Sequence, residues 1–261
     1  MEETILNCQD SAEGILTAVY RAYEWKLPRD RVSIRTGAVD LCLFASCRDV
    51  ETRPDLAKKV SDTIKRRFGR QVWEDLSFAM AACDERKGTA VLRTIDLGLS
   101  GRIRGRLTQG LGEEWIRIVF ELGRRVRNEY HRQQEFLRFR QAQEGYLFAL
   151  TEPKEDVTAF LMPHFSDRLP MENFVIVDSL RGIAGVHPAG RPWVLLRLNE
   201  EEKGRMAGAA GHTSQEEAEA AELFRCFCRT VSIRERENPG LQRQHLPLRF
   251  RGTMTEFDPP G

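Results

Sequence analysis

The spacing of apolar residues changes near Gly145, and this change restricts the folds that the chain can adopt. Before Gly145, apolar residues recur every three or four positions, which is typical of amphipathic helices. After it, turn residues separate the short apolar runs YLFALTEP, NFVIVD, GIAGVH and PWVLLRL, which is typical of strands. We therefore expect an α+β fold: a helical N-terminal half with a short strand or two, and a C-terminal, mostly antiparallel sheet flanked by helices.

The same change predicts two modules, which pack either separately or as one domain. Residues 1–142 form a mainly helical module that opens with a strand and a helix, and residues 143–261 form an α+β module with an Arg-rich C-terminal strap. The opening strand covers residues 4–8, and Asp10 and Ser11 are the candidate N-caps of the helix that follows it. An apolar run at residues 39–44 is a second candidate strand.

Several further amphipathic helices are expected, the first starting at Pro54. Two of them bear on function, and the longer runs from about residue 113 to residue 141. Its outer face is rich in Arg, and residues 102–140 hold ten Arg against five Glu. Such a face suits a phosphate backbone, but most such faces are simply solvated, partly through Glu–Arg pairs at helical spacing. Its apolar stripe consists of Trp115, Ile118, Val119, Leu122, Val126, Tyr130 and Leu137. The shorter helix, capped by Ser214, is expected to bury Ala218, Leu223, Phe227 and Val231.

The net charge of +1 hides a segregation of charge along the chain. It is the sum of 40 basic and 39 acidic residues, and it excludes a uniformly basic coat protein and an acidic disordered chain. Of the basic residues 33 are Arg, whose planar guanidinium suits phosphates, carboxylates and base edges. Segments 102–140 and 225–251 are basic, whereas segment 200–222 is acidic. A protein that binds nucleic acid through part of its surface therefore remains open.

The sequence shows no sign of a membrane segment or of secretion. No apolar run approaches the roughly 18 residues that cross a bilayer, and the acidic start lacks the regions of a signal peptide. The six cysteines fit no common disulfide framework, so we expect a cytoplasmic protein with reduced thiols and no membrane association. Because no G-x-S-x-G, H-E-x-x-H or C-x-x-C pattern occurs, we expect no metal and no cofactor.

The segment PHFSDRLP holds His164, Asp167 and Arg168. On one helical turn His164 and Arg168 share a face, so both can meet one phosphate or carboxylate, and His can act as an acid or base near neutral pH. An equally strong interpretation is a His–Asp or Arg–Asp pair that caps the turn. Together with His131 and Glu129, near the end of the long helix, His164 and Asp167 are the candidate catalytic residues.

The strap ERENPGLQRQHLPLRF is crowded with amide and guanidinium side chains, the groups that read base edges and phosphates. The alternative is a structural strap whose polar groups bind carbonyls and carboxylates of the body. The candidate nucleic-acid-binding residues are Arg236, Asn238, Gln242, Arg243, Gln244 and Arg249 of the strap, with Arg138 and Arg168 from outside it.

The sequence resembles a bacterial family described as a probable DNA metabolism protein or as a domain of unknown function. The resemblance rests on ILNCQDSAEGILTAVYRAYE, NEYHRQQEFLRF, PHFSDRLP, NFVIVDSLRG, and IRERENPGLQRQHLPLRF followed by MTEF. Members are typically encoded beside a radical-SAM protein that is itself assigned to DNA modification or repair. The resemblance thus implies a role in DNA repair or modification, with that iron–sulfur protein as partner.

Three functions remain on these grounds. The first is a DNA-binding accessory subunit that holds DNA for the radical-SAM partner. The second is a stand-alone DNA-processing hydrolase, of nuclease or glycosylase type, that uses the His and carboxylate candidates. The third is an assembly partner that contacts protein through segment 200–222 and never binds DNA. The sequence lacks the clustered carboxylates of two-metal nucleases, which favours the accessory role.

Overall fold

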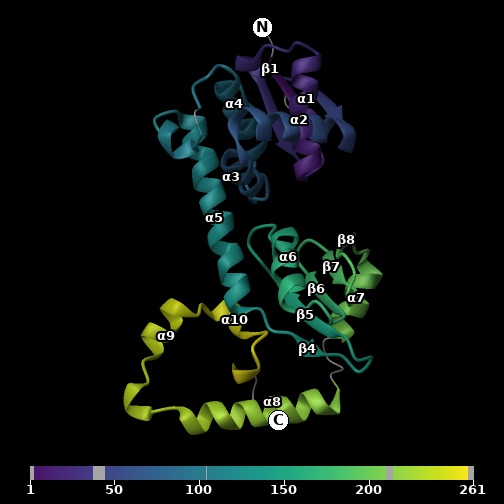
Figure 1. The fold of residues 1–261 in the computed structure, drawn as a ribbon, viewed down its shortest axis with the longest axis vertical. Coiled ribbons are helices and arrows are strands. Elements are labelled where there is room, and N and C mark those ends of the chain that lie inside the picture. The colour runs from purple at the N-terminus through teal and green to yellow at the C-terminus, as the bar shows by residue number, and fades with distance from the viewer. Residues whose placement is uncertain (1–2, 38–44, 104, 210–213, 258–261) are drawn as a thin grey trace. The chain divides into compact units, whose positions relative to one another are not determined.

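A computed structural model describes residues 3–37, 45–103, 105–209 and 214–257 (Figure 1). The candidate strand at residues 39–44 lies outside these described residues, as does Arg104. The chain forms two compact units, Met1–Asn128 and Glu129–Gly261. Helix α5, Glu114–Phe136, runs through the boundary between them.

The first unit is built on a three-stranded parallel sheet in the order β2-β1-β3. Parallel neighbours need a crossover connection, and α1 supplies it between β1 and β2. Of the two candidate caps of α1, Ser11 is the N-cap, because its hydroxyl accepts a hydrogen bond of 3.0 Å from the Gly14 N–H. The elements are β1 (Glu3–Cys8), α1 (Ala12–Glu24), a 3-10 helix (Arg29–Arg31), β2 (Val32–Thr36) and β3 (Ala45–Val50).

Helices complete the core of this unit. Leu6 of β1, Ile15 of α1 and Ile34 of β2 are fully buried, and they meet apolar residues from the helices that follow β3. These elements are α2 (Pro54–Phe68), α3 (Arg70–Met80), α4 (Lys87–Leu99), a 3-10 helix (Leu107–Gly110) and the first part of α5. Within α5 the predicted apolar stripe is buried or half-buried from Trp115 to Val126, whereas Arg117 and Arg124 are exposed.

The second unit is built on a five-stranded mixed sheet in the order β4-β5-β6-β7-β8. Strands β5 and β6 pair in parallel and are connected through α6, while the other neighbours are antiparallel. Phe148, Val177 and Ala184 form a buried cluster on this sheet. The elements are β4 (Arg140–Gln141), β5 (Leu147–Thr151), α6 (Thr158–Arg168), β6 (Phe174–Asp178), β7 (Ile183–His187) and β8 (Val194–Arg197).

The predicted strand layout was therefore wrong in both halves. The N-terminal half holds a three-stranded parallel sheet rather than a strand or two. Strand β3 was not expected, because its sequence ASCRDV has polar exposed residues and no apolar run. The C-terminal sheet is mixed rather than mostly antiparallel. Its parallel pair was missed because the helix around PHFSDRLP begins earlier, at Thr158, and is long enough to serve as a crossover.

Helices α7 to α10 follow the sheet. Ser214 caps α8 as predicted, but the expected buried face of α8 was wrong: Leu223 is 72% exposed, Phe227 60% and Val231 55%. The elements are α7 (Glu200–Ala209), α8 (Gln215–Val231), a 3-10 helix (Arg234–Arg236), α9 (Pro239–His245), α10 (Leu248–Arg251) and a last 3-10 helix (Thr255–Phe257). In the described part of the chain, no helix combines the length and apolar character that a membrane span requires.

Candidate functional site

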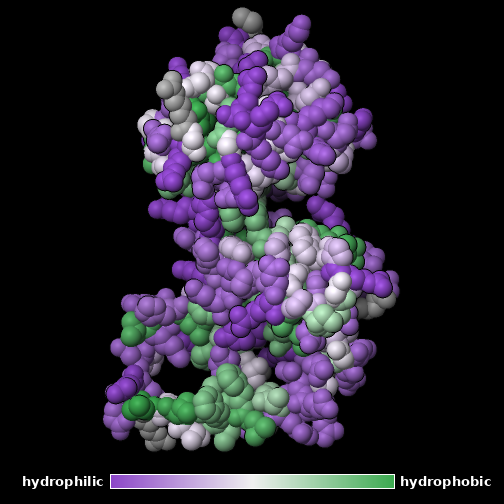
Figure 2. Space-filling view, in the orientation of Figure 1, coloured by the Kyte–Doolittle hydropathy of each residue, from purple (hydrophilic) through white to green (hydrophobic). Residues whose placement is uncertain are grey.

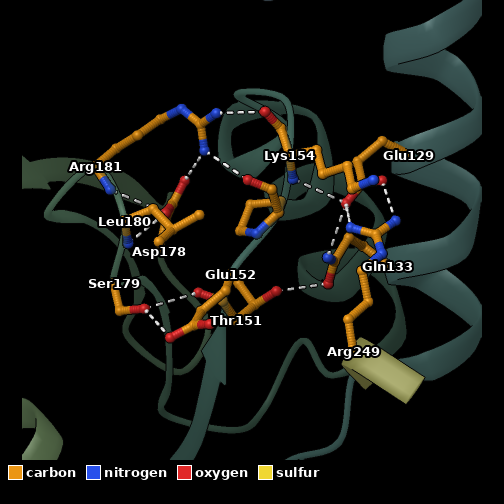
Figure 3. A network of polar contacts seen from close by, with 11 residues as sticks. Glu129, Gln133, Thr151, Glu152, Lys154, Asp178, Ser179, Leu180, Arg181 and Arg249 are labelled. Carbon is orange, nitrogen blue, oxygen red and sulfur yellow. Dashed lines mark hydrogen bonds and ion pairs between the residues drawn. The ribbon is translucent and has the colours of Figure 1, made fainter. Parts of the chain in front are cut away.

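A partly buried ion pair joins two residues that the sequence assigned to different roles (Figure 3). Glu129, in α5, has a side chain only 5% exposed, and Arg249 reaches it from α10. The two guanidinium nitrogens of Arg249 donate to the two carboxylate oxygens at 2.7 and 2.5 Å. This bidentate geometry is the strong form of an Arg–carboxylate contact. It anchors α10, at the end of the strap, to the C-terminal part of α5.

Two more groups complete the surroundings of Glu129. The backbone N–H of Lys154 donates to Oε1 at 3.1 Å, and the Gln133 amide donates to the same oxygen at 3.4 Å. Burial opposes the charge of Glu129, but Arg249 and these two donors outweigh it, so the pKa of Glu129 lies below its usual value. Glu129 is thus ionised, and Arg249 balances its charge, which makes Glu129 a weak proton donor or acceptor.

A second buried carboxylate, that of Asp178, lies on the other side of loop 152–154, the loop that contains Lys154. Asp178, at the end of β6, accepts hydrogen bonds from the Leu180 and Arg181 N–H groups and, at 2.9 Å, from the Arg181 guanidinium. Arg181 also donates to the carbonyls of Pro153 and Lys154 at 2.9 and 2.8 Å. Burial is the main influence on Asp178 and raises its pKa despite the opposing Arg181. Loop 152–154 is therefore clamped between Arg181 and Glu129.

A cavity of about 210 Å³ lies beside this network. The Thr151 hydroxyl donates to the Gln133 side-chain oxygen at 2.6 Å, which links β5 to α5 on one side of the cavity. The rings of Phe136 and Phe250 lie 5.0 Å apart, between α5 and α10. The lining consists of Gln133, Phe136, Leu137, Leu150, Thr151, Glu152, Arg249, Phe250, Gly252 and Thr253.

The strap surrounds a second, more open hollow of about 490 Å³. Asn238 acts here as a helix cap, because its side chain accepts a hydrogen bond of 3.0 Å from the Leu241 N–H and so starts α9. Arg251 donates to the Gln242 side chain at 3.2 Å, which ties α9 to α10. The lining consists of Ser232, Arg236, Glu237, Asn238, Pro239, Leu241, Gln242 and His245.

The remaining strap candidates are exposed. Arg236 and Gln244 face solvent, and Arg243, also exposed, donates through Nε to the Pro239 carbonyl at 3.1 Å. Arg138 contacts the last 3-10 helix, with 3.6 Å between its Nη2 and the Glu256 carboxylate. Arg249, Asn238 and Gln242 thus make the protein contacts expected of a structural strap. Arg236 and Gln244 are exposed, and Arg243 is exposed although its Nε binds the Pro239 carbonyl.

The acid–base candidates do not gather at one point. His164 is half-buried in α6 with its ring 4.9 Å from that of Phe165, whereas Asp167 and Arg168 are exposed. His131 is exposed, with its Nδ1 3.2 Å from the Gln134 side-chain oxygen. Over the residues that the structure describes, no hydrogen bond or ion pair joins His164 or Asp167 to Glu129. Their catalytic use stays a prediction.

Sequence reasoning missed most of the network, including the side chains of Gln133, Thr151, Asp178 and Arg181. Gln133 carried a signal, because it lies one helical turn after Glu129 on the same face. Asp178 and Arg181 lie in NFVIVDSLRG, where a carboxylate is followed three residues later by Arg in a turn. Among the described residues, no group of three or more His, Cys, Asp or Glu side chains is placed to hold a metal ion.

Comparison with known proteins gives one family. No curated protein and no solved structure matches the chain. The sequence model of the family described as "Domain of unknown function (DUF4130)" matches residues 85–256, which is more than half of the chain. The match includes Glu129, Arg249, Asp178 and Arg181, and the part before residue 85 lies outside it. The expected membership in a family of unknown function is thereby confirmed: this chain belongs to the DUF4130 family.

Proposed function

We propose that this protein binds DNA as the accessory partner of a radical-SAM iron–sulfur enzyme that repairs or modifies DNA. The observation that carries the proposal is the open hollow of the strap, where Arg236, Gln242 and His245 lie around one space. Guanidinium groups bind phosphates, and amide groups pair with base edges. The hollow thus combines both kinds of contact in one exposed place.

The strap is held in shape before any ligand binds. Asn238 caps α9, Arg251 holds Gln242, and the Arg249–Glu129 pair anchors α10. A segment fixed in this way loses little conformational freedom on binding, which raises its affinity for a ligand of matching shape.

The charges around the hollow favour one orientation of DNA. Glu237 lines the hollow and accepts a hydrogen bond of 3.3 Å from Ser232, so the interior carries a carboxylate that repels phosphate. A carboxylate accepts hydrogen bonds from the amino group of a base. We therefore place base edges toward Glu237 and one phosphate at Arg236, an exposed lining residue of the hollow, with a neighbouring phosphate at Arg243, which is exposed elsewhere on α9.

The exposed face of α8 supports a protein partner. Leu223, Phe224, Phe227 and Val231 recur at helical spacing, and each is at least 44% exposed. Figure 2 shows apolar residues gathered on the surface where α8 lies. Contiguous exposed apolar surface of this kind marks protein interaction sites. In the proposal this face contacts the radical-SAM protein, and the partner supplies the chemical step.

DNA binding is tested by fluorescence anisotropy with the full chain and a labelled duplex over a salt series. The logarithm of the affinity should fall linearly with the logarithm of the salt concentration. Arg236→Ala and Arg243→Ala should each weaken binding and lower that slope by about one. Arg191→Ala, which removes an exposed Arg outside the strap, is the matched control and should bind like the wild type. Binding that ignores salt, or an equal loss in the control, contradicts the proposal.

The partner is tested by co-expression with the radical-SAM iron–sulfur protein and affinity purification. The wild-type chain should co-purify with it, and Leu223→Glu with Phe227→Glu should abolish the complex without weakening DNA binding. Cys226→Glu adds one of the two negative charges at an exposed position of α8 that is not a member of the apolar stripe, and it should keep the complex. Failure of the wild-type chain to co-purify would refute the accessory role.

A further inference from the structure

The cavity of about 210 Å³ beside Arg249 has a buried floor and an exposed rim. Gln133, Thr151 and Phe250 are buried, whereas Glu152 and Gly252 are exposed. The cavity is therefore accessible from solvent on the side of Glu152 and Gly252. Neither the open hollow of the strap nor the proposed contact on α8 includes any of these lining residues.

Apolar side chains form much of its wall. Phe136 and Phe250 have ring centroids 5.0 Å apart and planes inclined at 48°, and Leu137 and Leu150 line the same space. Aromatic and branched side chains of this kind receive a flat ring by stacking and dispersion contacts. The wall thus favours a planar ligand.

The polar groups of the cavity offer both donors and acceptors. Thr151 gives its hydroxyl proton to Gln133 at 2.6 Å, so its oxygen still has lone pairs for a ligand donor. Gln133 uses one N–H toward Glu129 and has a second. Glu152 accepts from Ser179 at 3.1 Å through one carboxylate oxygen, and its other oxygen adds a further acceptor at the rim. This mixture suits a ring that carries both amino and carbonyl groups.

We propose that the cavity receives one unstacked nucleobase of the DNA that the strap binds; the inference therefore rests on the proposed function. The volume of about 210 Å³ is large enough to accommodate one base ring. The strap leads directly to the cavity, because Leu246 and Pro247 connect α9 to Arg249 and Phe250. A base drawn out of a duplex bound by α9 would thus enter beside α10.

A base leaves the stack most easily where its pairing is already weak, as at a mismatch or a damaged base. The cavity therefore predicts a preference for such DNA over a fully paired duplex of the same length. This preference is separate from the salt-dependent affinity, because the two depend on different residues: Arg236 and Arg243 bind phosphates, while Thr151 and Glu152 meet the base.

The test compares the affinities of the full chain for a duplex with one mismatch and for its fully paired counterpart at one salt concentration. The wild type should prefer the mismatch about tenfold. Gly252→Phe should fill the rim of the cavity without strain, since no atom lies within 4 Å of its Cβ position and its φ is −63°. This variant should lose the preference and keep the affinity for paired DNA. Glu152→Gln, an exposed and conservative change, should reduce the preference for the mismatched duplex.

The outcomes separate this inference from the function on which it rests. Gly112→Phe adds the same ring at an open position outside the cavity and should leave the preference unchanged. A wild-type chain that binds no DNA refutes the proposed function. A wild-type chain that binds both duplexes equally, or a Gly252→Phe variant that keeps the preference, refutes only the base-binding cavity.

Discussion

Replacing Arg249 by Met should destabilise the second unit more than an ordinary surface substitution does. The change leaves Glu129, with a side chain only 5% exposed, without a cation. Removing one partner of a buried pair costs about 3–5 kcal/mol. Because the Arg249 side chain is 26% exposed, and Lys154 and Gln133 still donate to Glu129, we expect the low end of that range, about 3 kcal/mol.

The loss of stability in Arg249→Met should depend on pH, and the direction of this dependence follows from the pKa of Glu129. In the wild type that pKa is lowered on folding. The pair therefore stabilises the folded state at pH values above the usual Glu pKa, and this stabilisation is lost as the pH falls through the pKa of the folded state. Without Arg249, burial dominates and should raise the pKa, so the Met variant should recover stability as it takes up a proton. The difference between the two proteins should therefore be largest near neutral pH and should shrink in acid.

Urea unfolding at several pH values measures this difference, and hydrogen exchange assigns it to the second unit. Amides in loop 152–154 and in α10 should exchange faster in Arg249→Met, while those of the first unit should not change. Glu129→Gln together with Arg249→Met should be more stable than Arg249→Met alone, because no buried charge remains. A destabilisation below about 1 kcal/mol, or one that is the same at every pH, would refute the reasoning.

Two further predictions concern the first unit. Gly88→Ala should lower its stability by about 1–3 kcal/mol in thermal or urea unfolding, because the new Cβ would lie 2.7 Å from the Ile34 backbone oxygen; Gly112→Ala, with open space around it, should not. Burial raises the pKa of Cys8 to about 12, so a thiol reagent at pH 8 should label exposed Cys83 and leave Cys8 unmodified until the protein unfolds, as mass spectrometry of the peptides would show.

Local sequence signals predicted the individual elements better than their arrangement. The Ser11 and Ser214 caps and the apolar runs that became β5 to β7 depend on nearest neighbours, so they can be read from a short window. Whether β5 and β6 run in parallel depends on the helix between them. A proline at position 163, inside α6, made that helix look like a turn.

The candidate site shows the same division. Glu129 and Arg249 were both named from the sequence, but nothing local indicates that residues 120 positions apart form one ion pair. Amphipathic spacing also failed for α8, because the same stripe of Leu223, Phe227 and Val231 fits either a buried core face or an exposed contact surface. Periodicity identifies an apolar face, and only the fold shows what covers it.

The separation of Glu129 and Arg249 has a consequence for biosynthesis. Arg249 is added to the chain 120 residues after Glu129, which at usual translation rates takes about 6–24 s. During that time the rest of α5 and the strands after it are synthesised, but the Glu129 carboxylate lacks the Arg249 guanidinium with which it pairs in the folded unit. The second unit therefore cannot complete its folding when its strands have been synthesised but Arg249 has not. We expect its slowest step to be the docking of α10, a long-range contact that closes only after residue 249 has been synthesised.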